Sequence, residues 1–270
     1  MTEALRDISL RENVRALGSV IVAYSGGVDS AVVLTLAVQE LGDRALGVTG
    51  LSPSMALGEA EAAAATARAV GARHESIATA EFEDERYRAN PVNRCYFCKH
   101  ELYGKLDAMA RERGIAHVVD GFNADDGTGP LDVRPGRGAA IQFGVRSPLA
   151  EVGLGKAEVR ALARRLGLDV WDKPATPCLS SRVPSGTPIE IDVLRRIDLA
   201  ERFLRATGFP VVRVRHFGER ARLEVPAADV ARLRARRESV ERNLREVGYS
   251  VVEIDARGYR MGSLNEKNSY

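Results

Sequence analysis

The 270-residue sequence is poor in cysteine and in long apolar runs. Its three cysteines are an odd number, which argues against a disulfide scaffold and favours metal-binding or reactive thiols. No apolar run approaches the ~18 residues that cross a membrane. Residues 1–15 are charged and amphipathic and lack the apolar core of a signal peptide. These absences predict a cytoplasmic protein with no membrane partner.

The sequence also lacks a large excess of charge of either sign. Lysine and arginine number 39 against 37 aspartate and glutamate, a formal net charge of +2, and only five of the basic residues are lysine. Proteins that bind nucleic acid usually carry a strongly basic surface, so we expect no nucleic-acid partner. The composition changes near residue 189. This predicts two domains, residues 1–188 with 22 basic and 24 acidic residues (−2) and residues 189–270 with 17 and 13 (+4).

The chain is organised around residues 23–30, Ala-Tyr-Ser-Gly-Gly-Val-Asp-Ser. This stretch follows a short apolar run that predicts a buried strand and precedes a longer one that predicts a helix. A Gly-Gly pair between strand and helix lets the backbone turn sharply and directs helix N–H groups at an anion such as phosphate. Ser25 and Ser30 add hydroxyl donors, and Asp29 could hold Mg²⁺ beside the phosphates. An ordinary glycine-rich turn is the alternative.

Strands and helices alternate along the first 166 residues. Predicted strands lie at residues 20–22, 45–49, 74–77 and 117–119, and predicted helices at 1–17, 31–41, 57–70, 93–113 and 156–166. Such alternation predicts an α/β fold with a parallel, doubly wound sheet that binds ligands at the C-terminal ends of its strands. The glycine-rich segment 127–146 is predicted to be a loop, and the single Trp171 is expected to be buried.

The C-terminal part has a different pattern, a smaller α+β arrangement. Predicted helices lie at residues 189–207 and 227–247, and predicted strands at 211–215, 223–225 and 251–254.

Two further segments are predicted to lie near the phosphates. Gly121, Asn123 and Asp125 follow the strand that ends at residue 119, at the sheet edge where ligands bind. A simple polar turn is equally consistent with that segment. The proline-rich loop 172–182 cannot form a regular helix and is expected to close the first domain, with Lys173 and Arg182 near the phosphates.

The cysteines allow several kinds of site. Cys95 and Cys98 form a C-x-x-C pair, and Cys178 lies eighty residues further on. Such a pair fits zinc, a redox dithiol or an iron–sulfur cluster. A structural zinc site would need a fourth ligand, for which His100 is the near candidate. Three thiolates fit a [4Fe-4S] cluster with one open iron, and three unrelated thiols are the remaining alternative.

The motifs together resemble a known family. Ser-Gly-Gly-Val-Asp-Ser at residues 25–30 is similar to the PP-loop of the N-type ATP pyrophosphatases. With Asn-Arg-Cys-Tyr-Phe-Cys-Lys at 93–99, Pro-Cys-Leu-Ser-Ser-Arg at 177–182 and the motif at 258–265, the chain resembles the LarE family. Those proteins are ATP-dependent sulfur transferases that build the nickel-pincer nucleotide cofactor of lactate racemase. The resemblance implies a PP-loop (adenine nucleotide alpha hydrolase-like) doubly wound sheet with a smaller C-terminal α+β domain.

The resemblance also implies an activity. The family's substrate is pyridinium-3,5-biscarboxylic acid mononucleotide, which is adenylated on a carboxylate before sulfur displaces AMP. Cys178 matches the sulfur-donating cysteine of the family. Members that carry the additional C-x-x-C pair resemble cluster enzymes in which Cys95, Cys98 and Cys178 would hold [4Fe-4S]. The family forms trimers and hexamers, so a homo-oligomer is expected, and no motif identifies the donor of the sulfide.

Site residues carried over by the resemblance fall into four groups. Those expected to bind ATP are Ala23, Ser25, Gly26, Gly27, Asp29, Ser30, Ser54, Met55, Gly121, Asn123 and Asp125. Asp29 and Asp125 are the expected Mg²⁺ ligands. Those expected to bind substrate are Arg94, Lys99, Arg182, Arg213 and Arg215. Those expected to act in catalysis are Cys95, Cys98, Cys178 and Lys173.

Three other functions remain open. A PP-loop tRNA thiolase also pairs a C-x-x-C and a distant cysteine around [4Fe-4S], but it usually needs a strongly basic RNA-binding surface. An amide ligase that uses ammonia needs no cysteine, so its activity would be retained in Cys178→Ala. An iron–sulfur scaffold would bind the cluster without cleaving ATP.

Overall fold

The computed structural model describes residues 3–128, 134–260 and 264, and it divides the chain into two compact units. Unit 1 contains residues 3–52, 57–84 and 93–176, and unit 2 contains 53–56, 85–92 and the chain from Pro177. Part of the C-terminal motif, residues 261–263 and 265, lies outside the described residues. No helix in the described ranges has the length and apolar character needed to cross a membrane.

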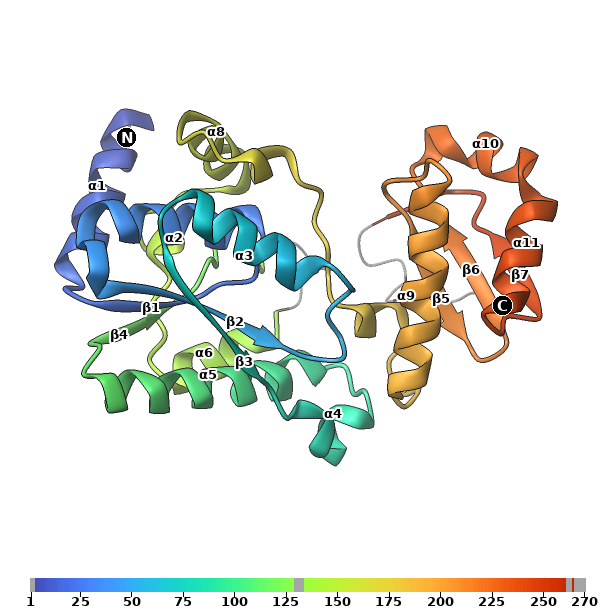
Figure 1. The fold of residues 1–270 in the computed structure, drawn as a ribbon, viewed down its shortest axis with the longest axis horizontal. Helices are drawn as coiled ribbons and strands as arrows, with labels where there is room; N and C mark the ends of the chain where they lie inside the picture. The colour runs from blue at the N-terminus through green and yellow to red at the C-terminus, as the bar shows by residue number, and fades with distance from the viewer. Residues whose placement is uncertain (1–2, 129–133, 261–263, 265–270) are drawn as a thin grey trace. The chain divides into compact units, whose positions relative to one another are not determined.

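Unit 1 is built on a four-stranded parallel sheet (Figure 1). Its strands are β1 (Val20–Ala23), β2 (Ala45–Leu51), β3 (Arg73–Ala78) and β4 (His117–Val119), in the order β3-β2-β1-β4. Val20 pairs with Ala45 on one side and with His117 on the other. The chain order reverses between β1 and β4, and ligands of doubly wound sheets bind at the C-terminal ends of such strands. The predicted α/β fold class is confirmed.

Helices cover both faces of this sheet (Figure 1). On one face lie α1 (Glu3–Ala16), α2 (Val28–Leu41), α3 (Glu59–Ala69), α7 (Pro148–Glu151) and α8 (Lys156–Arg165), and on the other α5 (Arg94–Arg113) and α6 (Gly136–Gln142). Side chains alternate along a strand. Val20 and Val22 therefore pack in the hydrophobic cluster formed with α1, α2, α3, α7 and α8, and Ile21 and Ala23 pack in the cluster formed with α5 and α6. Both faces of β1 are therefore buried, which explains its uninterrupted apolar sequence.

Two local predictions in unit 1 are wrong. The segment predicted to be a loop contains α6, which lies along α5. A Cβ at Gly138 would meet the Tyr96 ring at 3.5 Å, so the glycines of α6 permit close packing of two helices. Trp171, expected to be buried, is 38% exposed and lies under the guanidinium of Arg164, 5.2 Å from its ring centre. Its indole is therefore partly solvated and stacked on a cation.

Unit 2 carries a three-stranded sheet of order β5-β6-β7. Its elements are α4 (Glu85–Arg88), α9 (Ile191–Ala206), β5 (Arg213–Phe217), β6 (Arg220–Glu224), α10 (Val230–Ala235), α11 (Arg237–Glu246) and β7 (Val251–Ile254). β5 and β6 are antiparallel, and β6 and β7 are parallel. The single long helix predicted at 227–247 is wrong, because the chain breaks at Arg236. The guanidinium of Arg236 donates to the carbonyl of Thr207 at 2.5 Å.

Candidate functional site

The loop between β1 and α2 is ordered by its own serines. The hydroxyl groups of Ser25 and Ser30 lie 3.1 Å apart, and the Ser25 N–H donates to the Ser30 hydroxyl at 3.2 Å. The Ser30 hydroxyl lies 3.1 Å from the carbonyl of Gly27, to which it donates. No side chain of the described chain caps α2 at Gly27. The first N–H groups of α2 therefore remain directed at a ligand position, as an anion site requires.

Two glycines make this loop possible. Gly26 has φ +72°, and a Cβ there would lie 2.9 Å from the Cβ of Ala63 on α3. A Cβ at Gly121 would lie 2.6 Å from the backbone nitrogen of Ser30. The segment after β4 therefore packs directly against the first turn of α2. This brings together the segments after β1 and β4, as the sequence predicts.

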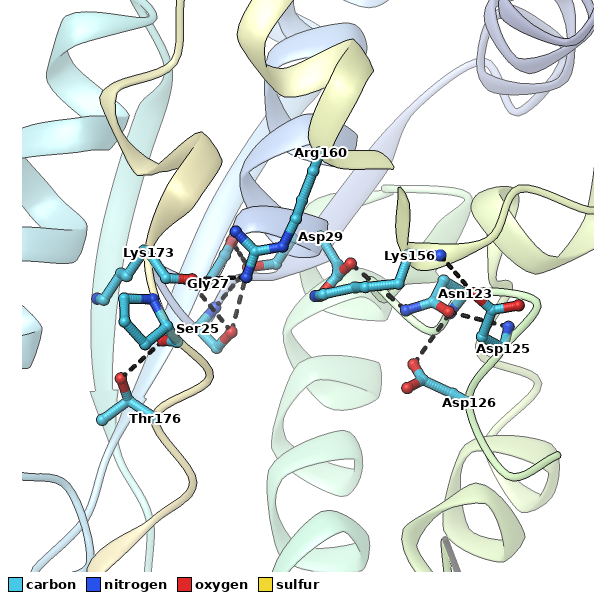
Figure 2. Close-up of polar contacts among 12 residues, drawn as sticks. Ser25, Gly27, Asp29, Asn123, Asp125, Asp126, Lys156, Arg160, Lys173 and Thr176 are labelled. Atoms are coloured by element: carbon cyan, nitrogen blue, oxygen red, sulfur yellow. Dashed lines mark hydrogen bonds and ion pairs between the residues drawn. The ribbon is translucent and has the colours of Figure 1, made fainter. Parts of the chain in front are cut away.

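A polar network joins the two segments (Figure 2). The amide of Asn123 donates to one oxygen of Asp29 at 3.4 Å, and the ammonium of Lys156 pairs with the other. The backbone N–H of Lys156 donates to Asp125 at 2.7 Å, and that of Asp125 donates to the Asn123 side chain at 3.0 Å. Asp29, Asn123 and Asp125 are thus brought together by Lys156, a residue that the sequence reasoning did not select.

Lys173 reaches the loop from another segment (Figure 2). Its ammonium lies 2.7 Å from Glu59 at the start of α3 and 3.5 Å from the carbonyl of Gly26. Arg160 on α8 donates to the carbonyls of Trp171 and Lys173, at 2.7 and 2.8 Å. Arg160, which lies on α8 one helical turn beyond Lys156, therefore fixes the backbone from which the Lys173 side chain extends.

The C-x-x-C pair lies in the first turns of α5. Cys95 is exposed, Cys98 is half-buried, and neither forms a disulfide. Lys99 lies 5.3 Å from the ring centre of Tyr103. The charge interaction with Tyr103 is the largest cause that raises the pKa of Lys99. Cys98, Asp120 and Cys95 contribute less, and together these effects exceed the opposing effect of burial. The ammonium therefore stays charged beside the cysteines.

Tyr103 connects this helix to the end of β4. Its hydroxyl donates to Asp120 at 2.9 Å, and the Ser147 hydroxyl donates to the other Asp120 oxygen at 2.7 Å. Burial raises the pKa of Tyr103 to about 12, so the phenol remains a donor at neutral pH. Asp120 directly precedes Gly121, so hydrogen bonds run from the cysteine helix to the segment that packs on α2.

Cys178 is presented by a turn that is held at several points within unit 2. The thiol belongs to an exposed residue just before the short 3₁₀ helix Leu179–Arg182. The Leu179 N–H donates to the carbonyl of Ser54 at 2.8 Å, and the hydroxyls of Ser54 and Ser180 each lie 2.9 Å from that of Tyr87. Ser54, predicted to contact adenosine, is buried in this arrangement, and Met55 beside it is half-buried.

The buried side chain of Arg182 holds the same turn through hydrogen bonds. It is fully buried, and it forms two hydrogen bonds with Glu201 on α9, at 2.8 and 3.0 Å. Its other nitrogen donates to the carbonyls of Pro177 and Cys178, at 2.5 and 3.0 Å. Burial alone would raise the pKa of Glu201, but the hydrogen bond and charge of Arg182 outweigh it and lower that pKa.

The two predicted substrate arginines of β5 are almost fully buried. Arg215 pairs with Glu224 at 2.9 Å and donates to the carbonyl of Ser181 at 2.9 Å. Arg213 donates to the carbonyl of Val212 at 2.8 Å and stacks on the ring of Tyr259. Burial lowers the pKa of Arg213. Arg94, the remaining predicted substrate residue, is half-buried at the start of α5.

The residues predicted to hold metals have suitable chemistry, but the described residues do not gather them as one site. Among the described residues, no three His, Cys, Asp or Glu side chains gather as a metal site. Mg²⁺ usually takes only one or two carboxylates, so Asp29 and Asp125, which lie near the loop between β1 and α2, would suffice as protein ligands. The three cysteines form no disulfide, and cysteine thiolates are the ligands that hold iron–sulfur clusters. Cys95 and Cys98 belong to unit 1 and Cys178 to unit 2.

Sequence reasoning missed Lys156, Arg160 and Glu59. The partners of Lys156 and Glu59 lie more than a hundred residues away, and Arg160 acts through the backbone carbonyls of Trp171 and Lys173, which no motif marks. One signal could have found the lysine. The chain has only five lysines, so a lysine directly after Gly155, at the start of a predicted helix, stands out among the arginines.

Comparison with known proteins gives relatives along nearly the whole chain. No family model matches. An uncharacterised protein of Synechocystis is 42% identical over 259 residues, 95% of this chain and 96% of that protein. Pyridinium-3,5-bisthiocarboxylic acid mononucleotide synthase of Lactiplantibacillus plantarum is 35% identical over 266 residues, 98% and 95%. An uncharacterised protein of Methanocaldococcus jannaschii is 27% identical over 241 residues, 89% and 90%.

Proposed function

The chain belongs to the LarE family, that of pyridinium-3,5-bisthiocarboxylic acid mononucleotide synthase, and from this membership we propose that it converts pyridinium-3,5-biscarboxylic acid mononucleotide to a thiocarboxylate with consumption of ATP. The observation that carries the proposal is the likeness over 98% of the chain, which includes both the phosphate loop and the turn of Cys178. A nucleotide substrate also suits a chain of formal charge +2 better than tRNA does.

The first proposed step is adenylation. A carboxylate oxygen of the substrate attacks the α-phosphorus of ATP, the bond between α-phosphorus and the bridging oxygen breaks, and pyrophosphate leaves with the electron pair. The N–H groups at the start of α2 and the ammonium of Lys173 would neutralise the leaving group. Asp29 and Asp125 would hold Mg²⁺, which supplies Lewis-acid stabilisation of the phosphates when bound.

The second proposed step is sulfur transfer. A hydrosulfide sulfur attacks the acyl carbon, the bond to the AMP oxygen breaks, AMP leaves, and the proton of the hydrosulfide is released as the thiocarboxylate forms. Cys95, Cys98 and Cys178 would be the ligands of a [4Fe-4S] cluster, which when bound supplies an open iron position for sulfide. The exposed, firmly held Cys178 would keep this chemistry in one orientation.

The substrate itself would be held by cations. We propose Arg213 and Arg215 for its phosphate, because they lie two residues apart on β5 and so project from one face of the strand. Arg94 and Lys99 are the other proposed contacts, whereas Arg182, also predicted to bind substrate, is fully buried against Glu201 and would act by holding the Cys178 turn. The proposed assembly is a homo-oligomer, a trimer or hexamer.

The test is an anaerobic reaction of the purified chain with substrate, ATP, Mg²⁺ and sulfide, with AMP and thiocarboxylate measured by mass spectrometry. The wild-type chain should form both products, and Cys178→Ala should form no thiocarboxylate. Lys105→Met, which changes an exposed lysine on α5, serves as the control and should be fully active. Thiocarboxylate formed without ATP, or an active Cys178→Ala variant, would contradict the proposal.

A further inference from the structure

Two lysines flank the phosphate loop, and each is neutralised by a carboxylate. In Figure 2, Lys173 lies on one side of Gly27 and Asp29, and Lys156 on the other. Lys173 pairs with Glu59, and Lys156 pairs with Asp29. The two come from different elements, the segment after residues 169–172 and the first residue of α8. The loop therefore has a cation on either side. The sequence motifs predicted Lys173 and did not predict Lys156.

The position of Lys156 is fixed by its backbone. Its N–H donates to Asp125, and a Cβ at the preceding Gly155 would lie 2.7 Å from an Asp125 oxygen. The N–H of Gly155 also donates to Glu158 at 3.1 Å, which caps α8. The buried face of α8 packs in the core through Val159 and Leu162. The helix thus begins at the site, with its first side chain directed at the loop.

The pair that Lys156 makes is easily exchanged. Its side chain is 37% exposed and that of Asp29 is 22% exposed, and ion pairs of such exposure contribute little to stability. A triphosphate carries several negative charges and offers charge-assisted hydrogen bonds that are stronger than neutral ones. An ammonium held beside the loop would therefore move to a bound polyphosphate.

We propose that Lys156 is a second pyrophosphate-binding residue, which exchanges Asp29 for the β- and γ-phosphates when ATP binds. This inference rests on the ATP use proposed above. Lys156 would then hold the leaving pyrophosphate opposite Lys173, and Asp29 would be released to ligate Mg²⁺. Since AMP lacks the β- and γ-phosphates, Lys156 should contribute to the affinity for pyrophosphate and ATP and not to the affinity for AMP.

Titration calorimetry with inorganic pyrophosphate, ATP and AMP in the presence of Mg²⁺ tests this assignment. Loss of one charge-assisted hydrogen bond predicts that Lys156→Met weakens pyrophosphate and ATP binding roughly tenfold or more, with AMP affinity unchanged. Lys156→Arg should keep most of the affinity, and Lys105→Met, the exposed control, should keep all of it. Unchanged AMP affinity also reports that the variant is folded.

Lys156→Met removes the proposed contact with pyrophosphate, and it also leaves the Asp29 carboxylate without its lysine partner. A double-mutant cycle separates these two effects on pyrophosphate binding. In an Asp29→Asn background titrated without Mg²⁺, so that loss of a metal ligand does not interfere, Lys156→Met should still weaken pyrophosphate binding. The assignment is overturned if the substitution has no effect in that background, or if AMP binding falls as much as pyrophosphate binding. A wild-type chain that binds pyrophosphate through Lys156 but forms no AMP from ATP and substrate would overturn the proposed function alone.

Discussion

At the scale of single residues, the turn that presents Cys178 depends on one buried ion pair. Arg182 and Glu201 are both 0% exposed, and Arg182 donates in turn to the carbonyl of Cys178. Arg205 and the backbone N–H of Val214 also donate to Glu201, at 2.5 and 3.0 Å. A buried carboxylate with this many donors is satisfied, so the pair can hold the turn in one conformation.

Removing the carboxylate should therefore be costly. Glu201→Gln leaves the buried Arg182 charge uncompensated, and we expect a loss of about 3 kcal/mol in the free energy of unfolding. Urea unfolding followed by circular dichroism measures this loss. Glu246→Gln, an exposed change of the same kind on α11, should have almost no effect.

The same pair predicts a pH dependence. Glu201 has a pKa below its ordinary value of 4.5 in the folded chain, so it contributes stability that is present above pH 4.5. That contribution is lost as the pH falls through the lower, folded-state pKa, because the unfolded carboxylate takes up its proton first. In Glu201→Gln the acid limb of the stability curve should be shallower than in the wild type. Parallel acid limbs for the two chains would contradict this assignment.

Glu59 controls how available Lys173 is. The two side chains are 28% and 24% exposed and lie 2.7 Å apart, so Glu59 competes with a phosphate for the ammonium. We expect Glu59→Gln to tighten pyrophosphate binding roughly two- to fivefold, the range that a partly exposed ion pair allows. Glu61→Gln, on the same turn of α3 but exposed, is the matched control for calorimetry. Weaker binding by Glu59→Gln would mean that Glu59 supports the site and does not mask it.

At the scale of elements, the site depends on the contact of the segment after β4 with α2. A Cβ at Gly121 would meet backbone atoms of Asp29 and Ser30 within 3 Å, and backbone cannot move aside as a side-chain end can. Gly121→Ala should therefore cost about 1–3 kcal/mol of stability and weaken ATP binding. Thermal unfolding and calorimetry measure the two effects.

Gly104→Ala is the matched control for that substitution. Gly104 lies inside α5, and a Cβ there would meet only the Phe143 ring, at an ordinary 3.5 Å. Alanine in a helix interior is more favourable than glycine, so this variant should gain about 0.5–1 kcal/mol. A loss of similar size in both variants would show that the Gly121 contact is not what distinguishes them.

The elements that the sequence predicts well are those whose patterns are local. The strand before residue 24, the glycine turn and the helix after it follow one another within a few residues, and β1, β2 and β4 contain buried apolar residues. The predictions fail where long-range packing decides. Glycine in residues 136–138 favours a loop locally, yet those glycines let α6 approach Tyr96 and Lys99 of α5. Likewise, the apolar spacing of residues 230–244 suits one helix, and Arg236 is turned toward Thr207 instead.

The candidate site divides in the same way. Ser25, Gly26, Gly27 and Asp29 could be selected because one contiguous motif carries them. The roles of Lys156 and Glu59 could not be predicted in this way, because each depends on a partner more than thirty residues away, Asp29 in one case and Lys173 in the other. Such pairs become visible only when the sheet brings distant segments to the same edge.

At the scale of the whole molecule, the residues of the proposed chemistry are distributed over both units. Unit 1 carries the phosphate loop, both flanking lysines and the Cys95–Cys98 pair, whereas unit 2 carries Cys178 and the buried arginines. The sulfur of the product has two possible origins in such a chain. It is either sulfide held by a cluster and replaced after each cycle, or the sulfur of Cys178 itself, which is spent once.

Anaerobic reconstitution distinguishes these origins by composition as well as by activity. If the three cysteines hold a cluster, about four irons should bind per chain, and each of Cys95→Ala, Cys98→Ala and Cys178→Ala should lose them. With sulfide present, one chain should then form many molecules of thiocarboxylate, and its mass should be unchanged after the reaction. The opposite result is a chain without iron that forms one product and becomes lighter at Cys178 by the mass of hydrogen sulfide. Because oxidation of a thiol to oxygen acids adds mass, that loss cannot be confused with damage in air.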